Sequence, residues 1–463
     1  MRILLINPSS FNLYTHIGAQ MPPLGIAYLA AVLKEKGHSP EIFDMDVMPG
    51  KPDYKNYRIV GISCLTSTYL KGLEIAREVK DAGRIVVMGG YHPTFMDGEV
   101  LKTGLVDYVV RGEGEYVLPE LVNHIEDDAD VKDVKGISYM GGNKLIRTED
   151  APYPDVDEIP LPARDILPLS SYKAFLDERP MTPVITSRGC PFNCSFCASS
   201  KFGGLKWRAR SALSVIEEVE ILKERYGFGS IDFMDDNFTM NPARVVKISE
   251  ELLKRDVGIK WWCLSRADTI VKNEDMVKVA VRSGLNMVFL GIESVEEDVL
   301  RSYGKREDTT TFANAITLLK RYGVKTWASI MIGALNETGS MISKTINFIK
   351  KLDPHAVQIS ILTPYPGTRL FEEVKGRITT WNWNLYDGAH AVFNTYHLNT
   401  KKIQSILRKA YLNIYLAPKR VVREIRHALE YHLVKRLVVN YPRKAIVAMR
   451  YIRWNVKCVM WNV

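Results

Sequence analysis

The chain lacks the features of a secreted or membrane-spanning protein. Its 463 residues include only six cysteines and nine histidines. No apolar run reaches the length of about 18 residues that a transmembrane helix needs, so we expect no membrane span. The first residues, MRILLINPSS, predict a short strand and a turn rather than a signal peptide. Few cysteines and no secretory signal together favour a reducing cytoplasm.

Three of the cysteines lie in one short run, RGCPFNCSFC, as Cys190, Cys194 and Cys197. A disulfide framework does not explain them, because their number is odd. A zinc site would need a fourth ligand close by, and the nearest histidines are His124 and His355. The spacing C-x3-C-x2-C instead predicts an iron–sulfur cluster. Three thiolates on a cube of four irons would leave one iron open to a substrate or cofactor.

This motif resembles the signature of the radical SAM enzymes, in which an aromatic residue, here Phe196, precedes the last cysteine. The resemblance implies a [4Fe–4S] cluster whose open iron chelates the amino and carboxylate groups of S-adenosylmethionine (SAM). Reduction then cleaves SAM and releases a 5′-deoxyadenosyl radical. Phe196 is expected to shield the cluster and touch the adenine, with simple loop packing as its alternative role. No second cysteine cluster occurs, so we expect no auxiliary iron–sulfur cluster.

Strands and helices alternate along the first 126 residues. This rhythm predicts a parallel sheet with helices on both faces, an α/β fold. Ligands of such sheets bind outside the carboxyl ends of the strands, which here lead into the loops 7–10, 63–67, 89–94 and 112–115. The expected strands are 2–8, 41–46, 58–67, 84–90 and 106–115, and the expected helices are 23–37, 69–83 and 117–127.

These segments resemble the cobalamin-binding domain that precedes many radical SAM cores, in PPLGIAYLAAVLKEKGH (22–38), GGYHPT (89–94) and VVRGEGE (109–115). The resemblance implies a Rossmann-like (flavodoxin-like) domain over residues 1–130. The motif D-x-H-x-x-G is absent, so we expect cobalamin without a protein histidine on cobalt. The alternative is a domain of this fold that has lost its ligand. The expected cobalamin contacts are Ser63, Thr66, Ser67, Gly89, Gly90, His92, Gly112, Glu113, Gly114 and Glu115.

The remainder divides into three parts. Residues 131–180 are rich in proline and predict an extended linker with a small sheet extension. Residues 181–370 contain six predicted strands alternating with helices, consistent with the partial (β/α)6 barrel of the radical SAM family. Residues 371–463 are expected to form a basic α-helical C-terminal extension.

Active groups of such a barrel are expected at the carboxyl ends of its strands. The resemblance implies that the acidic pair Asp235 and Asp236 receives the SAM amino group, with helix capping as its alternative role. Tyr365 is a candidate catalytic residue that either faces the substrate or packs the barrel mouth. The other expected SAM contacts are Arg266 for the carboxylate, Glu293 for the ribose or amino group, and Ile332 and Gly333 for the adenine.

The basic charge of the chain is concentrated in residues 401–463, which carry 15 Lys+Arg and 2 Asp+Glu, whereas the whole chain has a net charge of +9. Basic amphipathic helices with aromatic residues are typical of membrane surfaces, so we expect peripheral contact with an anionic membrane on its cytoplasmic face. The alternative is a helical cap on the barrel. Nucleic acid is not expected as a partner, because no RNA-binding module accompanies the charge.

Together these features predict a cobalamin-dependent radical SAM enzyme that methylates an unactivated carbon. The resemblance implies that the radical abstracts a hydrogen atom, methylcobalamin delivers the methyl group, and a second SAM restores it. We expect a small-molecule or lipid substrate, with an isoprenoid of lipid biosynthesis favoured by the basic extension, and an electron donor of the ferredoxin or flavodoxin type. The alternatives are radical ring closure or C–C bond formation on a lipid without methylation, and a non-catalytic iron–sulfur redox sensor.

Overall fold

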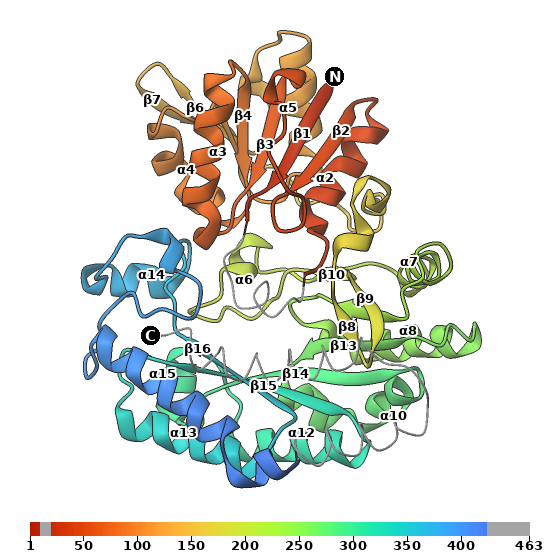
Figure 1. Ribbon diagram of the computed structural model, residues 1–463, viewed down its shortest axis with the longest axis vertical. Helices are drawn as coiled ribbons and strands as arrows, with labels where there is room; N and C mark the ends of the chain where they lie inside the picture. Colours follow the sequence, from red (N-terminus) through yellow and green to blue (C-terminus); the bar gives the residue numbers. More distant parts are fainter. Residues whose placement is uncertain (10–19, 424–463) are drawn as a thin grey trace.

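The computed structural model of the protein describes residues 1–9 and 20–423. These residues contain two seven-stranded sheets (Figure 1). Between them lies a two-stranded ribbon, β10 (Ser187–Arg188) and β11 (Arg208–Ala209). The carboxyl ends of the parallel strands of the first sheet point toward the second sheet. The α/β fold class predicted from the sequence is therefore confirmed.

The first sheet has the strand order β2-β1-β3-β4-β5-β6-β7. Strands β1 to β5 are parallel, whereas β6 and β7 add an antiparallel edge. Aliphatic residues fill the central strands because helices cover both faces. The strands are β1 (Arg2–Asn7), β2 (Ser39–Asp44), β3 (Ile59–Ser63), β4 (Ile85–Gly89), β5 (Tyr108–Val110), β6 (Ile137–Gly141) and β7 (Lys144–Arg147), and the helices are α2 (Leu24–Glu35), α3 (Tyr69–Asp81), α4 (Tyr91–Lys102) and α5 (Val117–Glu126).

Helix α4 was not expected from the sequence, which predicted a loop over 89–94. Its third residue is Pro93, and proline is compatible with the first turn of a helix because the backbone N–H groups there have no intrahelical partner. Strands β6 and β7 lie in the range expected as linker and join the first sheet. The division of the chain into domains at residues 130, 180 and 370 stays a prediction.

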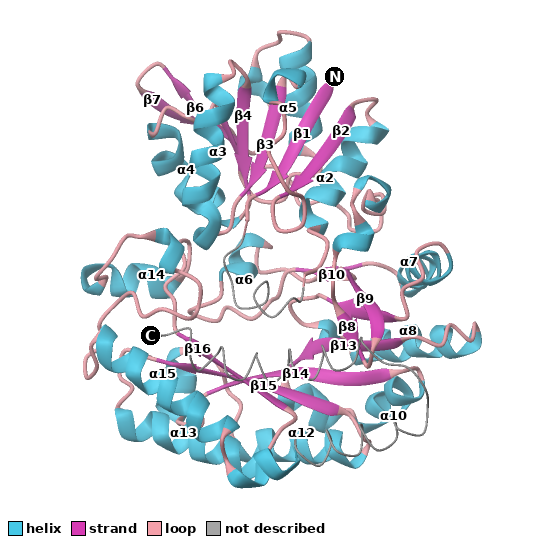
Figure 2. Ribbon diagram, viewed as in Figure 1, coloured by secondary structure: helices cyan, strands magenta, loops and turns pink. Residues whose placement is uncertain are grey.

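The second sheet has the order β16-β15-β14-β13-β12-β9-β8. Its six parallel strands confirm the predicted partial barrel, and the short antiparallel β8 is an addition. Helices cover one face, as the cyan ribbons of Figure 2 show. The strands are β8 (Phe175–Leu176), β9 (Arg179–Val184), β12 (Ser230–Phe233), β13 (Lys260–Ser265), β14 (Leu285–Glu293), β15 (Lys325–Ile332) and β16 (Ala356–Ile361).

The helices of this second part follow its strands in the expected alternation. They are α6 (Ala198–Phe202), α7 (Ala212–Glu224), α8 (Pro242–Lys254), α9 (Ala267–Lys272), α10 (Glu274–Arg282), α11 (Glu297–Ser302), α12 (Thr309–Arg321), α13 (Gly339–Leu352), α14 (Arg369–Val374) and α15 (Thr400–Tyr415). The two tyrosine hydroxyls of α15, Tyr411 and Tyr415, bond the backbone of β16. Helix α15 thereby covers the β16 edge of the sheet.

Side chains alternate between the two faces of the central strands. Trp261, Val288 and Ala328 belong to the hydrophobic core that the sheet shares with its helices. A residue adjacent to each of these in its strand, Trp262, Phe289 or Trp327, points to the opposite face. There the rings lie 5.8 Å (Trp262 to Trp327) and 5.5 Å (Phe289 to Trp327) apart, centre to centre. We call this group, Trp262, Phe289 and Trp327, the aromatic face.

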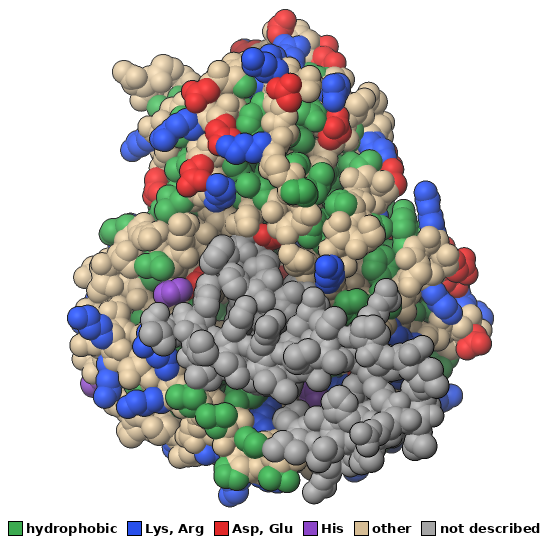
Figure 3. All heavy atoms as spheres, in the orientation of Figure 1, with side chains coloured by type: hydrophobic (Ala, Val, Ile, Leu, Met, Phe, Trp, Pro, Cys, Tyr) green, Lys and Arg blue, Asp and Glu red, His purple; other side chains and the backbone are tan. Residues whose placement is uncertain are grey.

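Most of the predicted basic extension, residues 424–463, lies outside the described residues. Figure 3 shows one face of the molecule. Where the first sheet and its helices form that face, basic and acidic side chains are interspersed. Among helices of the described ranges, none is long and apolar enough to cross a membrane. Expected membrane contact through residues 401–463 therefore stays a prediction.

Two glycines at equivalent places offer a matched test of the barrel's backbone geometry. Gly284 and Gly323 each follow a helix, precede a barrel strand and have positive φ, at +111° and +71°. A Cβ on Gly284 would lie 2.1 Å from the carbonyl oxygen of Ile259, whereas a Cβ on Gly323 would meet nothing within 4 Å.

We expect Gly323→Ala to lower the free energy of unfolding by about 1 kcal/mol, the cost of a left-handed alanine. Gly284→Ala should cost about 3 kcal/mol, because backbone must also move. Chemical denaturation of both variants measures the difference, and equal losses would contradict the close approach at Gly284.

Candidate cofactor site between the two sheets

The three clustered cysteines lie on the loop between β10 and α6. Their thiols form no disulfide and are partly exposed, and the N–H of Cys197 donates to the carbonyl oxygen of Cys194 at 3.2 Å. Within the described ranges, no three His, Cys, Asp or Glu side chains converge as ligands of one metal ion. An iron–sulfur cluster does not need such convergence, because each thiolate bonds a different iron. The loop therefore fits a cluster better than a single ion.

The two ends of this cysteine loop, which we call its neck, come together at two glycines. Gly189 has φ +75°, and a Cβ there would lie 2.2 Å from the carbonyl oxygen of Lys206. A Cβ on Gly203 would lie 2.6 Å from the Cα of Gly189. The two arms of the loop thus pass closer than side chains would allow. In the ligand-free protein, burial raises the pKa of Cys190 to about 11, so ligation of a metal must release its proton.

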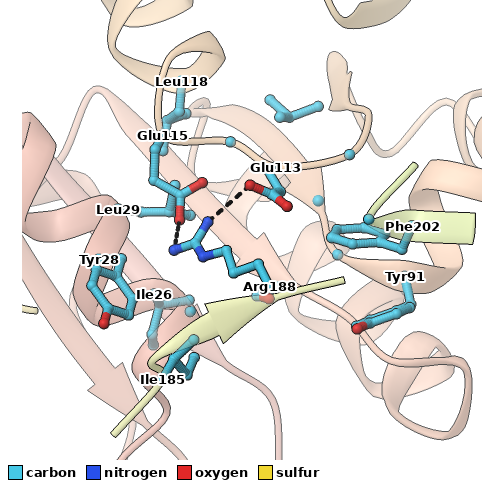
Figure 4. A pocket seen from close by; sticks show the side chains of 18 of the residues that line it. Ile26, Tyr28, Leu29, Tyr91, Glu113, Glu115, Leu118, Ile185, Arg188 and Phe202 are labelled. Atoms are coloured by element: carbon cyan, nitrogen blue, oxygen red, sulfur yellow. Dashed lines mark hydrogen bonds and ion pairs between the residues drawn. The ribbon is translucent and has the colours of Figure 1, made fainter. Parts of the chain in front are cut away.

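An open cavity separates this loop from the carboxyl ends of the first sheet (Figure 4). Its empty volume of about 1200 Å³ includes part of the open mouth. Gly25 and Gly112 line it, and a Cβ on either would meet no atom within 4 Å, so a ligand can approach the backbone there. Apolar side chains, among them Leu29, Leu118 and Phe202, line the walls. The cavity therefore suits a large, partly apolar ligand such as cobalamin.

Most of the expected cobalamin contacts line this cavity. They are Ser63, Gly89, Gly90, Gly112, Glu113, Gly114 and Glu115. Thr66 and Ser67 are not among its lining residues, and Thr66 is buried in a short 3-10 turn. The carboxylates of Glu113 and Glu115 already pair with arginine, so their availability to a ligand is restricted.

His92, an expected cobalamin contact, does not line the cavity in this structure. Its side chain is 0 % exposed and its ring stacks on Tyr69 at 4.0 Å, with the ring of Trp383 edge-on at 4.9 Å. Burial lowers the pKa of His92 to about 3, so the ring is neutral. Successive residues of a helix point about 100° apart, and the unexpected start of α4 at Tyr91 therefore turns Tyr91, not His92, into the cavity.

The two neighbouring aspartates at the end of β12 differ in environment. Asp235 is buried and accepts three hydrogen bonds, from the Thr186 N–H at 2.6 Å, the Thr186 hydroxyl at 2.5 Å and the Ser187 hydroxyl at 2.6 Å. Asp236 instead lines the cavity beside Gly189 and the cysteine loop. Asp235 thus anchors the chain that leads into the loop, and Asp236 is the member placed to contact a ligand.

The expected SAM contacts Arg266 and Glu293 belong to a buried chain of charges. Lys305 Nζ lies 2.9 Å from Glu293 Oε1 and also donates to the Gly291 carbonyl oxygen at 2.8 Å. Arg266 lies 3.1 Å from Glu307 Oε2. Glu293 has φ +63°, a strained value for a residue with a side chain. Sequence motifs did not reveal Lys305 or Glu307, because both follow α11 in a loop that carries no recognisable pattern.

The roles expected for Phe196, Ile332, Gly333 and Tyr365 stay predictions, and the structure shows what surrounds each of these residues. The Phe196 ring meets the Tyr303 ring edge-on at 5.1 Å, which agrees with the packing role. Ile332 is fully buried in the core shared with the helices, so only its backbone is available to an adenine. The Gly333 N–H donates to Glu337 Oε2 at 2.7 Å. Burial raises the pKa of Tyr365 to about 12, and Tyr365 is absent from the lining of the cavity.

Comparison with known proteins agrees with this geometry. Residues 13–122 match the family model of the B12 binding domain, and residues 184–349 match that of the radical SAM superfamily. The chain is 36% identical over 459 residues to a protein of Pyrococcus horikoshii described as an uncharacterized methyltransferase, with 95% of this chain and 97% of the relative covered.

A second relative is the anaerobic magnesium-protoporphyrin IX monomethyl ester cyclase of Rubrivivax gelatinosus. It is 31% identical over 411 residues, which cover 84% of this chain and 72% of the cyclase. Among solved structures, the cobalamin-dependent SAM radical enzyme OxsB with aqua-cobalamin bound superposes with a TM-score of 0.73 at 18% identity. That match covers 100% of this chain and 72% of OxsB, and it shows a shared fold.

The contrast between the two aspartates generates a prediction. Asp235→Asn should lower the free energy of unfolding by about 1–3 kcal/mol, because an amide group cannot accept all three hydrogen bonds. Asp236→Asn should cost less, about 0.5–1 kcal/mol, because Asp236 accepts only from Ser199 and the Gly189 backbone and an amide oxygen can keep such bonds. Denaturant unfolding of both variants measures this. A loss at Asp236 as large as that at Asp235 would contradict the assigned environments.

Proposed function

The chain belongs to the cobalamin-dependent radical SAM enzymes, and from this membership we propose that it transfers a methyl group to an unactivated carbon of an apolar substrate. Its cofactors are a [4Fe–4S] cluster, SAM and cobalamin. When bound, the cluster and SAM supply a carbon radical and cobalamin supplies a methyl group. The Pyrococcus horikoshii relative, described as a methyltransferase, supports the methyl transfer.

The observation that carries the proposal is the cavity that both parts of the chain line near the cysteine loop. Glycine loops of the first sheet form one wall, and Gly189, Ser199 and Asp236, which neighbour the cysteines, form the other. Methyl transfer to a carbon radical requires the methyl donor and the site of radical formation to reach the same substrate atom. One cavity bounded by both parts of the chain permits this approach, whereas two separate pockets would not.

The aromatic face supports an apolar substrate. Trp262, Phe289 and Trp327 come from three adjacent strands and lie on the face of the second sheet opposite its helices. Side chains on that face point toward the interior of the partial barrel. Aromatic rings there bury large apolar area at little cost in side-chain entropy. A substrate with fused rings or an extended hydrocarbon would fit this chemistry. The expected lipid or isoprenoid identity remains a prediction of the sequence.

A second candidate reaction is radical ring closure. The relative from Rubrivivax gelatinosus, 31% identical over 84% of this chain, is described as a cyclase. Ring closure would use the same radical but would add no carbon to the substrate. The mass of the product therefore separates the two reactions.

The test is anaerobic reconstitution with iron, sulfide and cobalamin, followed by SAM with a deuterated methyl group, a strong reductant and a hydrophobic extract. Methyl transfer predicts 5′-deoxyadenosine, S-adenosylhomocysteine and a product that has gained the deuterated methyl. Ring closure predicts deoxyadenosine and a product that has lost hydrogen. A redox sensor predicts neither nucleoside product, although the cluster and SAM bind.

Removal of the cluster ligands provides the control. We expect Cys194→Ala to lose most of its bound iron and all SAM cleavage, because each thiolate holds one iron of the cluster. Cys263→Ala is the matched variant, since Cys263 is a buried free thiol in the barrel core. It should retain iron and SAM cleavage. Iron assay and quantification of deoxyadenosine measure both, and full iron in Cys194→Ala would contradict the ligand assignment.

A further inference from the structure

Two arginines face each other at the neck of the cysteine loop. Strands β10 and β11 pair antiparallel with Arg188 directly opposite Arg208. The loop that carries all three cysteines leaves from Arg188 and returns at Arg208. Like charges directly opposite on paired strands destabilise the pairing. The ribbon therefore needs a negative charge from elsewhere to remain closed.

Glu113, in the loop between β5 and α5, supplies that charge. Its Oε2 atom lies 3.1 Å from a terminal nitrogen of Arg188 and 3.1 Å from a terminal nitrogen of Arg208. The other carboxylate oxygen pairs with the second terminal nitrogen of Arg208. Only 7% of the Glu113 side chain is exposed. One buried carboxylate thus bridges the two strands that close the loop.

Glu115 adds a second contact to the same arginine. Its Oε1 atom lies 2.6 Å from Arg188, and its side chain is 6% exposed. The ring of Tyr28 covers the guanidinium at 5.1 Å. Figure 4 shows Arg188 between the two carboxylates at the edge of the cavity. Two carboxylates and two guanidiniums therefore balance in charge, which a buried group of ions requires.

We propose that Glu113 and Glu115 are positioning residues that hold the neck of the cysteine loop closed and thereby fix the cluster relative to the cobalamin cavity. Both glutamates lie in the segment that matches the B12 binding domain, and both arginines lie in the radical SAM segment. The ion pairs thus connect the two cofactor-binding parts beside Cys190. This role is independent of whether the enzyme methylates or closes a ring.

Hydrogen exchange of the reconstituted holoenzyme tests the proposal. In Glu113→Gln, amides of residues 185–189 and 206–210 should exchange at least about tenfold faster, because the opposed arginines lose their bridge. Asp97→Asn is the matched control. Asp97 is a buried carboxylate that pairs with Arg147 at 2.7 Å, but both residues belong to the first part of the chain. It should leave exchange at the neck unchanged.

A second substitution separates this role from general stability. Glu113→Gln with Arg208→Gln removes both the bridge and the repulsion, so exchange at the neck should return to within about threefold of the parent. Glu115→Gln, which leaves the bridge intact, should give a smaller acceleration and keeps the test available if Glu113→Gln fails to fold. Unchanged exchange in both single variants, or no recovery in the double variant, would overturn the proposal.

Pulsed electron paramagnetic resonance gives a readout that stability alone would not move. The distance between the reduced cluster and the paramagnetic Co(II) form of cobalamin should broaden in Glu113→Gln and stay narrow in Asp97→Asn. If Glu113→Gln keeps the same narrow distance distribution and only binds cobalamin more weakly, Glu113 is a cobalamin contact. That result would overturn the positioning role. Equal broadening in Asp97→Asn would also overturn it.

Discussion

The rest of the structure depends on one cavity, which lies at the carboxyl ends of the parallel strands of the first sheet and of strands β9 and β12 of the second. At this edge of a parallel sheet the loops can approach a ligand with backbone groups, and the helices that follow present their N-termini. The close approach of Gly189 to Lys206 and the open space over Gly112 are consequences of the same requirement. Large side chains at these places would either separate the arms of the loop or fill the cavity.

Several buried charged groups near the candidate cofactor site are paired within the protein. Asp235 accepts three hydrogen bonds, and Glu293 pairs with Lys305. A buried charge without a partner would cost several kcal/mol, so these pairs stabilise the buried charges. They also fix the side chains in place, which lowers the cost of organising them when a ligand arrives. A cofactor must therefore compete with existing partners, and this holds also for Asp236, which lines the cavity and is hydrogen-bonded by Ser199 and the Gly189 backbone.

The sequence predicted the parts of the site that depend on local order. The spacing of Cys190, Cys194 and Cys197 is a short-range pattern, and the alternation of strands and helices survives in both sheets. It failed where the outcome depends on geometry beyond the segment. The start of α4 decided that Tyr91 and not His92 faces the cavity. The opposition of Arg188 and Arg208 arises only when β10 and β11 pair, and no local pattern marks Glu113 as their common partner.

Methylation and ring closure begin with the same radical, so the groups that bind the cluster and SAM do not separate the two reactions. We propose that the place where the substrate is held helps to separate them, since there one carbon can be turned toward cobalamin and another kept away. The aromatic face meets that condition, because rigid rings on adjacent strands fix the plane of an apolar substrate. Under the proposed function, the residues of this face are one place where the reaction could diverge, as sites commonly diverge on a common fold.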